Sequence, residues 1–142
     1  MTANDLIQAL SLEPHPEGGY FRETWRAPCP PGARSSGTAI YFLLTRGPGS
    51  AWHRVDAAEM WHFYAGAPLE LRMSKEGSGV ERRMLGTDLA SGECPQIVVP
   101  TGVWQAARTC GDWTLVGCTV TPGFEFDGFE MAPPGWEPDS AP

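Results

Sequence analysis

Turn-forming residues punctuate this chain from end to end. Its 142 residues include 17 glycines and 14 prolines, and turn signals separate short apolar runs about every ten residues. Short strands need a turn at each end, whereas long helices are interrupted by such spacing. The pattern predicts an all-β sandwich or barrel and excludes a helical bundle.

The runs between the turns are the expected strands. Residues 20–26 alternate in polarity, and residues 38–46 form a nearly continuous apolar run that is typical of a central strand. Further strands are expected at residues 51–55, 59–65, 69–73, 80–85, 96–99, 104–108 and 113–120. One short helix is expected at the N-terminus, where Thr2 or Asn4 can cap apolar residues at helical spacing.

Length and charge restrict the organisation and the partners. We expect one domain over residues 1–132, followed by a proline-rich surface tail over residues 133–142. The net charge of -7 disfavours nucleic acid as a partner. The chain has neither a long apolar segment nor a basic, hydrophobic N-terminus, so we expect no membrane partner and a cytoplasmic location.

Two spaced motifs concentrate the chemically active side chains. The first runs Gly47, five residues, His53, one residue, Val55, three residues, Glu59, six residues and Gly66. The second runs Pro100-Thr101-Gly102, two residues and Gln105. Positions 53 and 55 are two apart on an expected strand and point to the same side, and Glu59 enters the next strand after a short turn.

These spacings resemble the signature motifs of the cupin superfamily, G-x5-H-x-H-x3-E-x6-G and P-x-G-x2-H. The resemblance implies a double-stranded β-helix, which is a jelly-roll barrel with its site at the mouth. It also implies a homodimer, in which a strand such as residues 20–26 covers a sheet edge of the partner.

Longer segments are similar to one family within that superfamily. They are residues 15–21, with the sequence His-Pro-Glu-Gly-Gly-Tyr-Phe, and residues 39–44, 59–66 and 122–130. Together they resemble the uncharacterised cupins called domain of unknown function 985, over nearly the whole chain from Leu6 to Met131. This resemblance implies kinship in fold with dTDP-sugar epimerases and seed storage cupins, and brings no settled reaction.

The motifs depart from those of metal-binding cupins, which hold a divalent ion with three histidines and one glutamate. Val55 and Gln105 stand at two of the histidine positions. His53, Glu59 and Gln105 remain as a weak alternative metal set, since a neutral amide is a poor ligand. We therefore expect no metal and no other cofactor.

The candidate site residues divide into two groups. His53 is the candidate base, Glu59 holds its tautomer, and Tyr41 or Tyr64 is the candidate acid. Trp61, Phe63, Trp104, Gln105 and Glu23 are candidate ligand-binding residues; Arg22 and Glu17 are further candidates for the rim. Strand alternation puts His62 and Tyr64 on the face opposite Glu59, although a bulge would reverse this.

Three functions fit these residues. The first is a metal-independent sugar-type isomerase or epimerase that acts on a small polar ligand in the barrel. The second is a binding module that holds such a ligand without chemistry, and the third, disfavoured by the replaced histidines, is a metal-dependent enzyme. Serine-hydrolase and phosphate-loop motifs are absent from the sequence.

Overall fold

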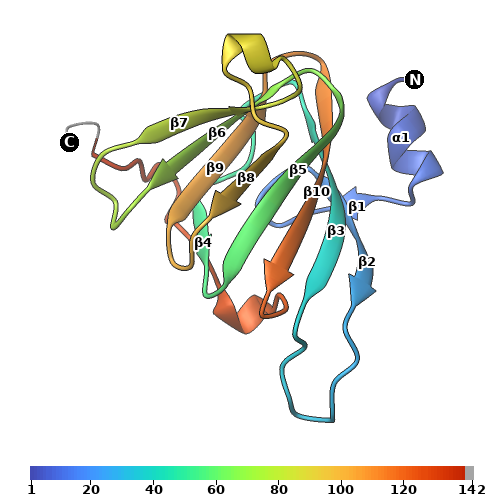
Figure 1. Cartoon of the computed structure of the whole chain (residues 1–142), viewed down its shortest axis with the longest axis vertical. Coiled ribbons are helices and arrows are strands. Elements are labelled where there is room, and N and C mark those ends of the chain that lie inside the picture. Colours follow the sequence, from blue (N-terminus) through green and yellow to red (C-terminus); the bar gives the residue numbers. More distant parts are fainter. Residues whose placement is uncertain (140–142) are drawn as a thin grey trace.

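Two antiparallel β-sheets pack face to face in the computed structural model, which describes residues 1–139 (Figure 1). The first has six strands in the order β1-β2-β3-β10-β5-β8, and the second has five in the order β11-β4-β9-β6-β7. The predicted all-β barrel is confirmed. No helix in residues 1–139 is both long enough and apolar enough to span a bilayer.

The strands of the first sheet are β1 (Glu13–Pro14), β2 (Tyr20–Arg26), β3 (Thr38–Thr45), β5 (Ala58–Gly66), β8 (Gln96–Val99) and β10 (Trp113–Thr121). Those of the second are β4 (His53–Val55), β6 (Leu69–Ser74), β7 (Glu81–Leu85), β9 (Trp104–Thr109) and β11 (Phe129–Met131). Two short 3-10 turns, η1 (Leu89–Ser91) and η2 (Phe126–Gly128), complete the elements with helix α1.

Helix α1 (Ala3–Ala9) begins at Thr2, as the sequence predicts. The Thr2 hydroxyl accepts from the backbone N–H of Asp5, whose carboxylate accepts from the Thr2 N–H, which makes a capping box. Leu6 packs with Leu12 and Leu43 on the outer face of the first sheet. The helix therefore covers the outside of the barrel and leaves its interior free.

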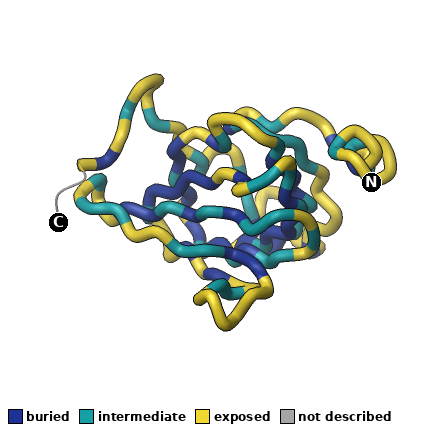
Figure 2. The backbone as a smooth tube through the Cα atoms, turned by 90° about the horizontal axis from the view of Figure 1, so that it is seen from above, coloured by how far each residue is buried: buried dark blue, intermediate teal, exposed yellow. Residues whose placement is uncertain are grey.

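The barrel interior is filled at one end and hollow at the other. The filled end is a cluster of buried residues that includes Leu44, Trp61, Leu69, Leu71, Leu85 and Val116. Buried segments occupy the middle of the molecule, and exposed segments form the surrounding loops (Figure 2). The hollow end contains a cavity of about 320 Å³, a volume in the range of small-molecule sites.

Most residues of the C-terminal tail from 133 to 139 are exposed, but Trp136 is half-buried. Trp136 packs against Trp104 and Trp52 on the outer face of the second sheet, with ring centroids 4.8 and 6.0 Å apart. Residues 140–142 of the predicted tail lie outside the described residues.

Candidate functional site

The cavity takes its walls from both sheets and from the segment around η2. Inward positions of β3, β4, β5 and β10 contribute Thr38, Ile40, Phe42, His53, Val55, Glu59, Cys118 and Val120. The N-terminal segment contributes His15, Glu17, Phe21, Glu23 and Arg26, and residues 124–129 contribute Phe124, Glu125, Phe126 and Phe129. The result is an apolar chamber that contains a few ionisable groups.

His53 lines this cavity and is 2% exposed. Its Nδ1 lies 2.8 Å from the carbonyl oxygen of Ala51, and its Nε2 lies 2.8 Å from Oε2 of Glu17. A carbonyl oxygen and a carboxylate can only accept, so both ring nitrogens donate and the imidazolium form fits the site. Burial opposes this charge, but the Glu17 carboxylate, together with the charge of Glu59 and the Ala51 carbonyl oxygen, raises the pKa of His53 to about 9.

The Glu17 partner is a correction to the sequence-based expectation, which paired His53 with Glu59. A tight turn carries Glu17 into the barrel, because Gly18 and Gly19 take positive φ angles of 102° and 79°. A Cβ at Gly19 would lie 2.9 Å from the Leu43 carbonyl oxygen, so glycine is required there. The turn brings Glu17 next to His53, although the two residues are far apart in the sequence. The spacing of residues along one strand therefore could not predict this contact.

Glu59 is oriented by a chain of two hydrogen bonds. The Trp61 indole N–H donates to Gln105 Oε1 over 2.9 Å, and Gln105 Nε2 donates to Glu59 Oε1 over 2.9 Å. Because an indole nitrogen can only donate, it fixes the Gln105 amide with its NH2 toward Glu59. Burial raises the pKa of Glu59 to about 7, with a further contribution from the charge of Glu17.

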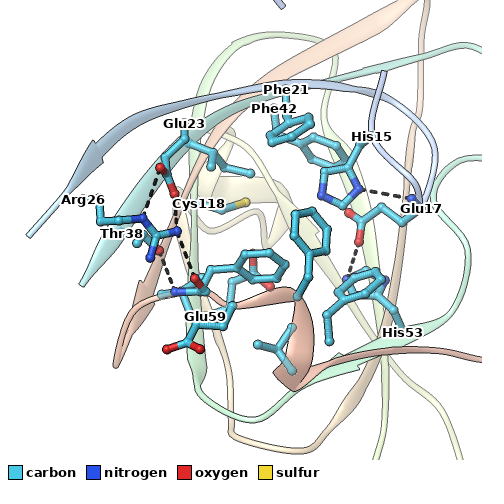
Figure 3. A pocket seen from close by; sticks show the side chains of 17 residues that line it. His15, Glu17, Phe21, Glu23, Arg26, Thr38, Phe42, His53, Glu59 and Cys118 are labelled. Atoms are coloured by element: carbon cyan, nitrogen blue, oxygen red, sulfur yellow. Dashed lines mark hydrogen bonds and ion pairs between the residues drawn. The ribbon is translucent and has the colours of Figure 1, made fainter. Parts of the chain in front are cut away.

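Arg26 and Glu23 are paired near the opposite side of the cavity. Arg26 Nη2 lies 2.6 Å from Glu23 Oε1 and donates to the Phe124 carbonyl oxygen over 3.0 Å. Figure 3 shows this pair facing the side that carries His15, Glu17 and His53. Burial lowers the pKa of His15, whose Nδ1 accepts from the Glu17 N–H. His15 is therefore neutral at physiological pH.

The predicted site residues do not all meet in the cavity. His53, Glu59 and Glu23 line it, and Gln105 contacts Glu59 from behind the wall. Trp61 and Phe63 share the inward face with Glu59 as predicted, but they belong to the filled end of the barrel. These two rings therefore pack in the core next to the cavity and do not form its aromatic wall.

The predicted positions of Tyr41 and Trp104 are wrong, because side chains alternate along a strand and these two face outward. Thr38, Ile40 and Phe42 of β3 face the cavity, so Tyr41 faces outward, with its ring centroid 6.3 Å from that of Tyr64. Neither tyrosine can act as the expected acid inside. Trp104 likewise points outward because its neighbour Gln105 points inward, and it packs in the tryptophan cluster with Trp136.

His62 lies on the outer face, as alternation predicts. Its Nε2 lies 3.1 Å from Thr119 Oγ1, and its Nδ1 lies 3.3 Å from Gln96 Nε2. The register shift between β5 and β10 falls beyond His62, between the pairs Val116–Phe63 and Leu115–Ala65. The alternation from Glu59 to Phe63 is therefore unbroken.

The site predicted from the sequence did not include three phenylalanines that form one wall of the cavity, which we call the phenylalanine wall. Phe124, Phe126 and Phe129 stand at interplanar angles of 84°, 67° and 76° to one another. Three phenylalanines within six residues are a compositional signal, but the strands nearby carry many aromatics as well. The pairing of β11 with β4, together with hydrogen bonds of Phe124 to Thr38 and Arg26, brings this segment over the cavity.

The donor set does not fit a divalent metal ion. The amide oxygen and nitrogen of Gln105 are engaged by Trp61 and Glu59, and both ring nitrogens of His53 face acceptors. Within residues 1–139, no three His, Cys, Asp or Glu side chains are placed to hold one ion. A protonated imidazole has no lone pair for a metal, so the site offers proton-transfer groups in place of ligands.

A small barrel of two antiparallel sheets, with a motif histidine and glutamate facing its hollow end, defines the cupin class. The match of residues 4–132 to the model of the Cupin superfamily (DUF985) shows that this chain belongs to that family.

Relatives match this chain over most of its length. A Shewanella oneidensis protein is 42% identical, with a TM-score of 0.88 over 93% of this chain and 85% of that one. A hypothetical protein from Leishmania major is 32% identical, with a TM-score of 0.84 over 93% of this chain and 88% of that one. The uncharacterised Saccharomyces cerevisiae protein YML079W is 29% identical over 86% of this chain and 71% of its own length.

Oxalate decarboxylase from Bacillus subtilis shares the fold alone. It is 16% identical with a TM-score of 0.62, and the match covers 83% of this chain and 29% of that one. Its activity therefore says nothing about the reaction of this chain.

Proposed function

We propose that this cupin binds a small polar metabolite in the cavity and moves a proton on it, as a metal-independent isomerase. The observation that supports the proposal is the pair of buried ionisable groups on the cavity wall, His53 held by Glu17 and Glu59 held by Gln105. A binding surface alone has no need to bury two such groups, because burying a charge is costly.

The environment of each group assigns its role. Between pH values of about 7 and 9, His53 carries a proton and Glu59 does not. Glu59 is then the base and His53 the acid, whereas the sequence-based expectation made His53 the base and Glu59 the group that holds its tautomer. Different surroundings shift the pKa values of two groups in this way, so that one is protonated and the other is not at the same pH, as an acid and a base in catalysis require.

The transfers balance for an α-hydroxy carbonyl substrate. Glu59 takes a proton from the carbon that bears the hydroxyl group, and the electron pair of that C–H bond forms the enediol double bond. The carbonyl oxygen receives its proton through the His53–Glu17 pair, in which Glu17 takes the Nε2 proton of His53 and passes a proton to the substrate. Glu17 then takes the proton of the original hydroxyl group and returns a proton to His53, and Glu59 returns its proton to the former carbonyl carbon.

Isomerisation fits this geometry better than epimerisation. Epimerisation requires a proton donor on the opposite face of the substrate, the role expected of Tyr41 or Tyr64. All three tyrosines of the chain lie outside the cavity lining. A single base that works on one face of the substrate can complete an isomerisation.

The test is hydrogen exchange from solvent. A panel of small hydroxy-carbonyl compounds is incubated with the protein in D2O, and deuterium at carbon is measured by mass spectrometry. We expect exchange with wild type and its loss in His53→Gln and Glu59→Gln. His62→Gln and Glu81→Gln are matched controls outside the cavity.

Two outcomes would change the proposal. Exchange that persists in both cavity variants rejects the assignment of the acid and base. A ligand that binds wild type and loses affinity in both variants, without any exchange, selects the non-catalytic binding module.

We also propose the homodimer that the cupin resemblance implies. In the single chain, β2 pairs with β3 of its own sheet, while Tyr64 on the outer face of that sheet is 52% exposed. Light scattering at micromolar concentration should give twice the 15.4 kDa chain mass. A monomer mass would reject the dimer.

A further inference from the structure

The charges of the cavity wall do not cancel. Four carboxylates line it, from Glu17, Glu23, Glu59 and Glu125, against the Arg26 guanidinium and the His53 imidazolium, since His15 is neutral. No lysine is among these lining residues. A ligand therefore meets a surplus of negative charge.

The cationic groups of the wall are already committed to carboxylates. Arg26 makes two hydrogen bonds to Glu23, at 3.3 and 2.6 Å, and a third to the Phe124 carbonyl oxygen. His53 donates to Glu17 and to a backbone carbonyl oxygen. An anionic ligand would have to displace one of these partners to gain a cation, and would leave a carboxylate unpaired in an apolar chamber.

Glu59 is the unbalanced group. Across the part of the chain that the structure describes, no Lys, Arg or His nitrogen lies within 4.0 Å of its carboxylate oxygens. Its side chain is buried, and its hydrogen-bond donor Gln105 is neutral. The carboxylate of Glu59 thus accepts a hydrogen bond from a neutral amide, and the His53 cation acts on its charge only from beyond ion-pair distance.

Aromatic rings form much of the remaining wall. Phe21, Phe42, Phe124, Phe126 and Phe129 line the cavity. The rings of Phe124 and Phe129 pack edge to face, with planes inclined by 67° and centroids 5.9 Å apart. Phenyl faces attract organic cations, and an aromatic box beside a carboxylate is how proteins hold quaternary ammonium groups.

We propose that the ligand of this cavity carries a positively charged organic nitrogen, such as a primary or methylated ammonium group, which lies against the phenylalanine wall within the field of Glu59. The proposal rests on the ligand site of the proposed function and narrows its substrate class. It excludes sugar nucleotides and other phosphate esters, which the resemblance to sugar epimerases would suggest.

The test compares two probes of nearly identical shape and different charge. Choline and 3,3-dimethylbutan-1-ol differ by one atom, a nitrogen in place of a carbon. Their affinities are measured by ligand-observed NMR and isothermal titration calorimetry at pH 8. We expect choline to bind about tenfold more tightly than the alcohol, as expected for a desolvated cation–π contact.

Two variants identify the source of the preference. Phe129→Leu keeps the apolar wall but removes a ring, and should weaken choline about three- to tenfold while leaving the alcohol nearly unchanged. Glu59→Gln should also weaken choline selectively. Glu81→Gln, which changes the net charge equally on the distant strand β7, should not.

Three results would overturn the inference. They are equal or tighter binding of the alcohol, equal weakening of both probes by Phe129→Leu, and no binding of choline by wild type. The proposed function is decided separately, because deuterium exchange into a neutral or anionic compound would support proton transfer even where the cation preference fails.

Discussion

The two ends of the barrel interior are built by the same strands and differ in what fills them. Along β5 the inward positions are Glu59 and then Trp61, and along β10 they are Cys118 and then Val116. At one end large apolar side chains meet and exclude water. At the other, ionisable groups and rings leave about 320 Å³ open. The cavity is therefore a continuation of the core along the same strands. In the cavity, ionisable side chains in pairs stand at positions where the filled end has large apolar side chains.

The largest expected effect comes from the boundary between the two ends. Trp61→Leu removes a fully buried ring and the indole donor that orients Gln105. We expect a loss of about 3 to 4 kcal/mol in the free energy of unfolding, measured by urea denaturation. A loss below about 1 kcal/mol would show that the filled end is not tightly packed.

Glu17→Gln should have the next largest effect, because it leaves His53 without its carboxylate. We expect a loss on the order of 2 kcal/mol at pH 6 and a fall in the pKa of His53 from about 9, followed by NMR. A raised histidine pKa stabilises the fold fully below its unfolded value near 6.5, and this contribution disappears as pH rises through about 9. The variant and wild type should therefore converge in stability above that pH.

An unchanged His53 titration in Glu17→Gln would contradict the ion pair. His62→Gln, on the outer face, is the control and should leave the His53 titration as in wild type.

Glu59→Gln should have a smaller effect of opposite sign. The raised pKa of Glu59 means that its stabilising proton is lost as pH increases from about 4.5 through about 7. The glutamine accepts the same Gln105 hydrogen bond without a buried charge, so the variant should be about 1 to 2 kcal/mol more stable at pH 8.

The titratable groups that face Glu59 are Glu17, His53 and Cys118. Melting temperatures of wild type and Glu59→Gln, measured from pH 4 to 8, should diverge only above about pH 5. A constant difference across this range would mean that Glu59 does not titrate there.

Phe126→Ala should have the smallest effect on stability. The ring lines the cavity, yet 55% of the residue is exposed. We expect a loss below about 1 kcal/mol in urea denaturation, because little apolar area leaves water when this ring packs. A loss comparable to that of Trp61→Leu would remove the distinction between wall and core.

The site could be predicted from the sequence only where its geometry is local. Glu59 and Trp61 share a face because side chains alternate along a strand, and the motif spacing brings His53 and Gln105 inward on β4 and β9. Tyr41 shows the limit. The β3 run is apolar on both faces, since α1 covers its outer side, so polarity does not reveal which face is the interior.

The sequence by itself determined the all-β class, the bounds of most strands within two residues, the short capped helix and the inward set of His53, Glu59 and Gln105. These follow from turn chemistry and a two-residue period, which act between near neighbours. Only the tertiary structure decided that Glu17 is the partner of His53 and that residues 124–129 form the aromatic wall. Both depend on how distant segments stack on the barrel, and that is set by the packing of two sheets and not by any local pattern.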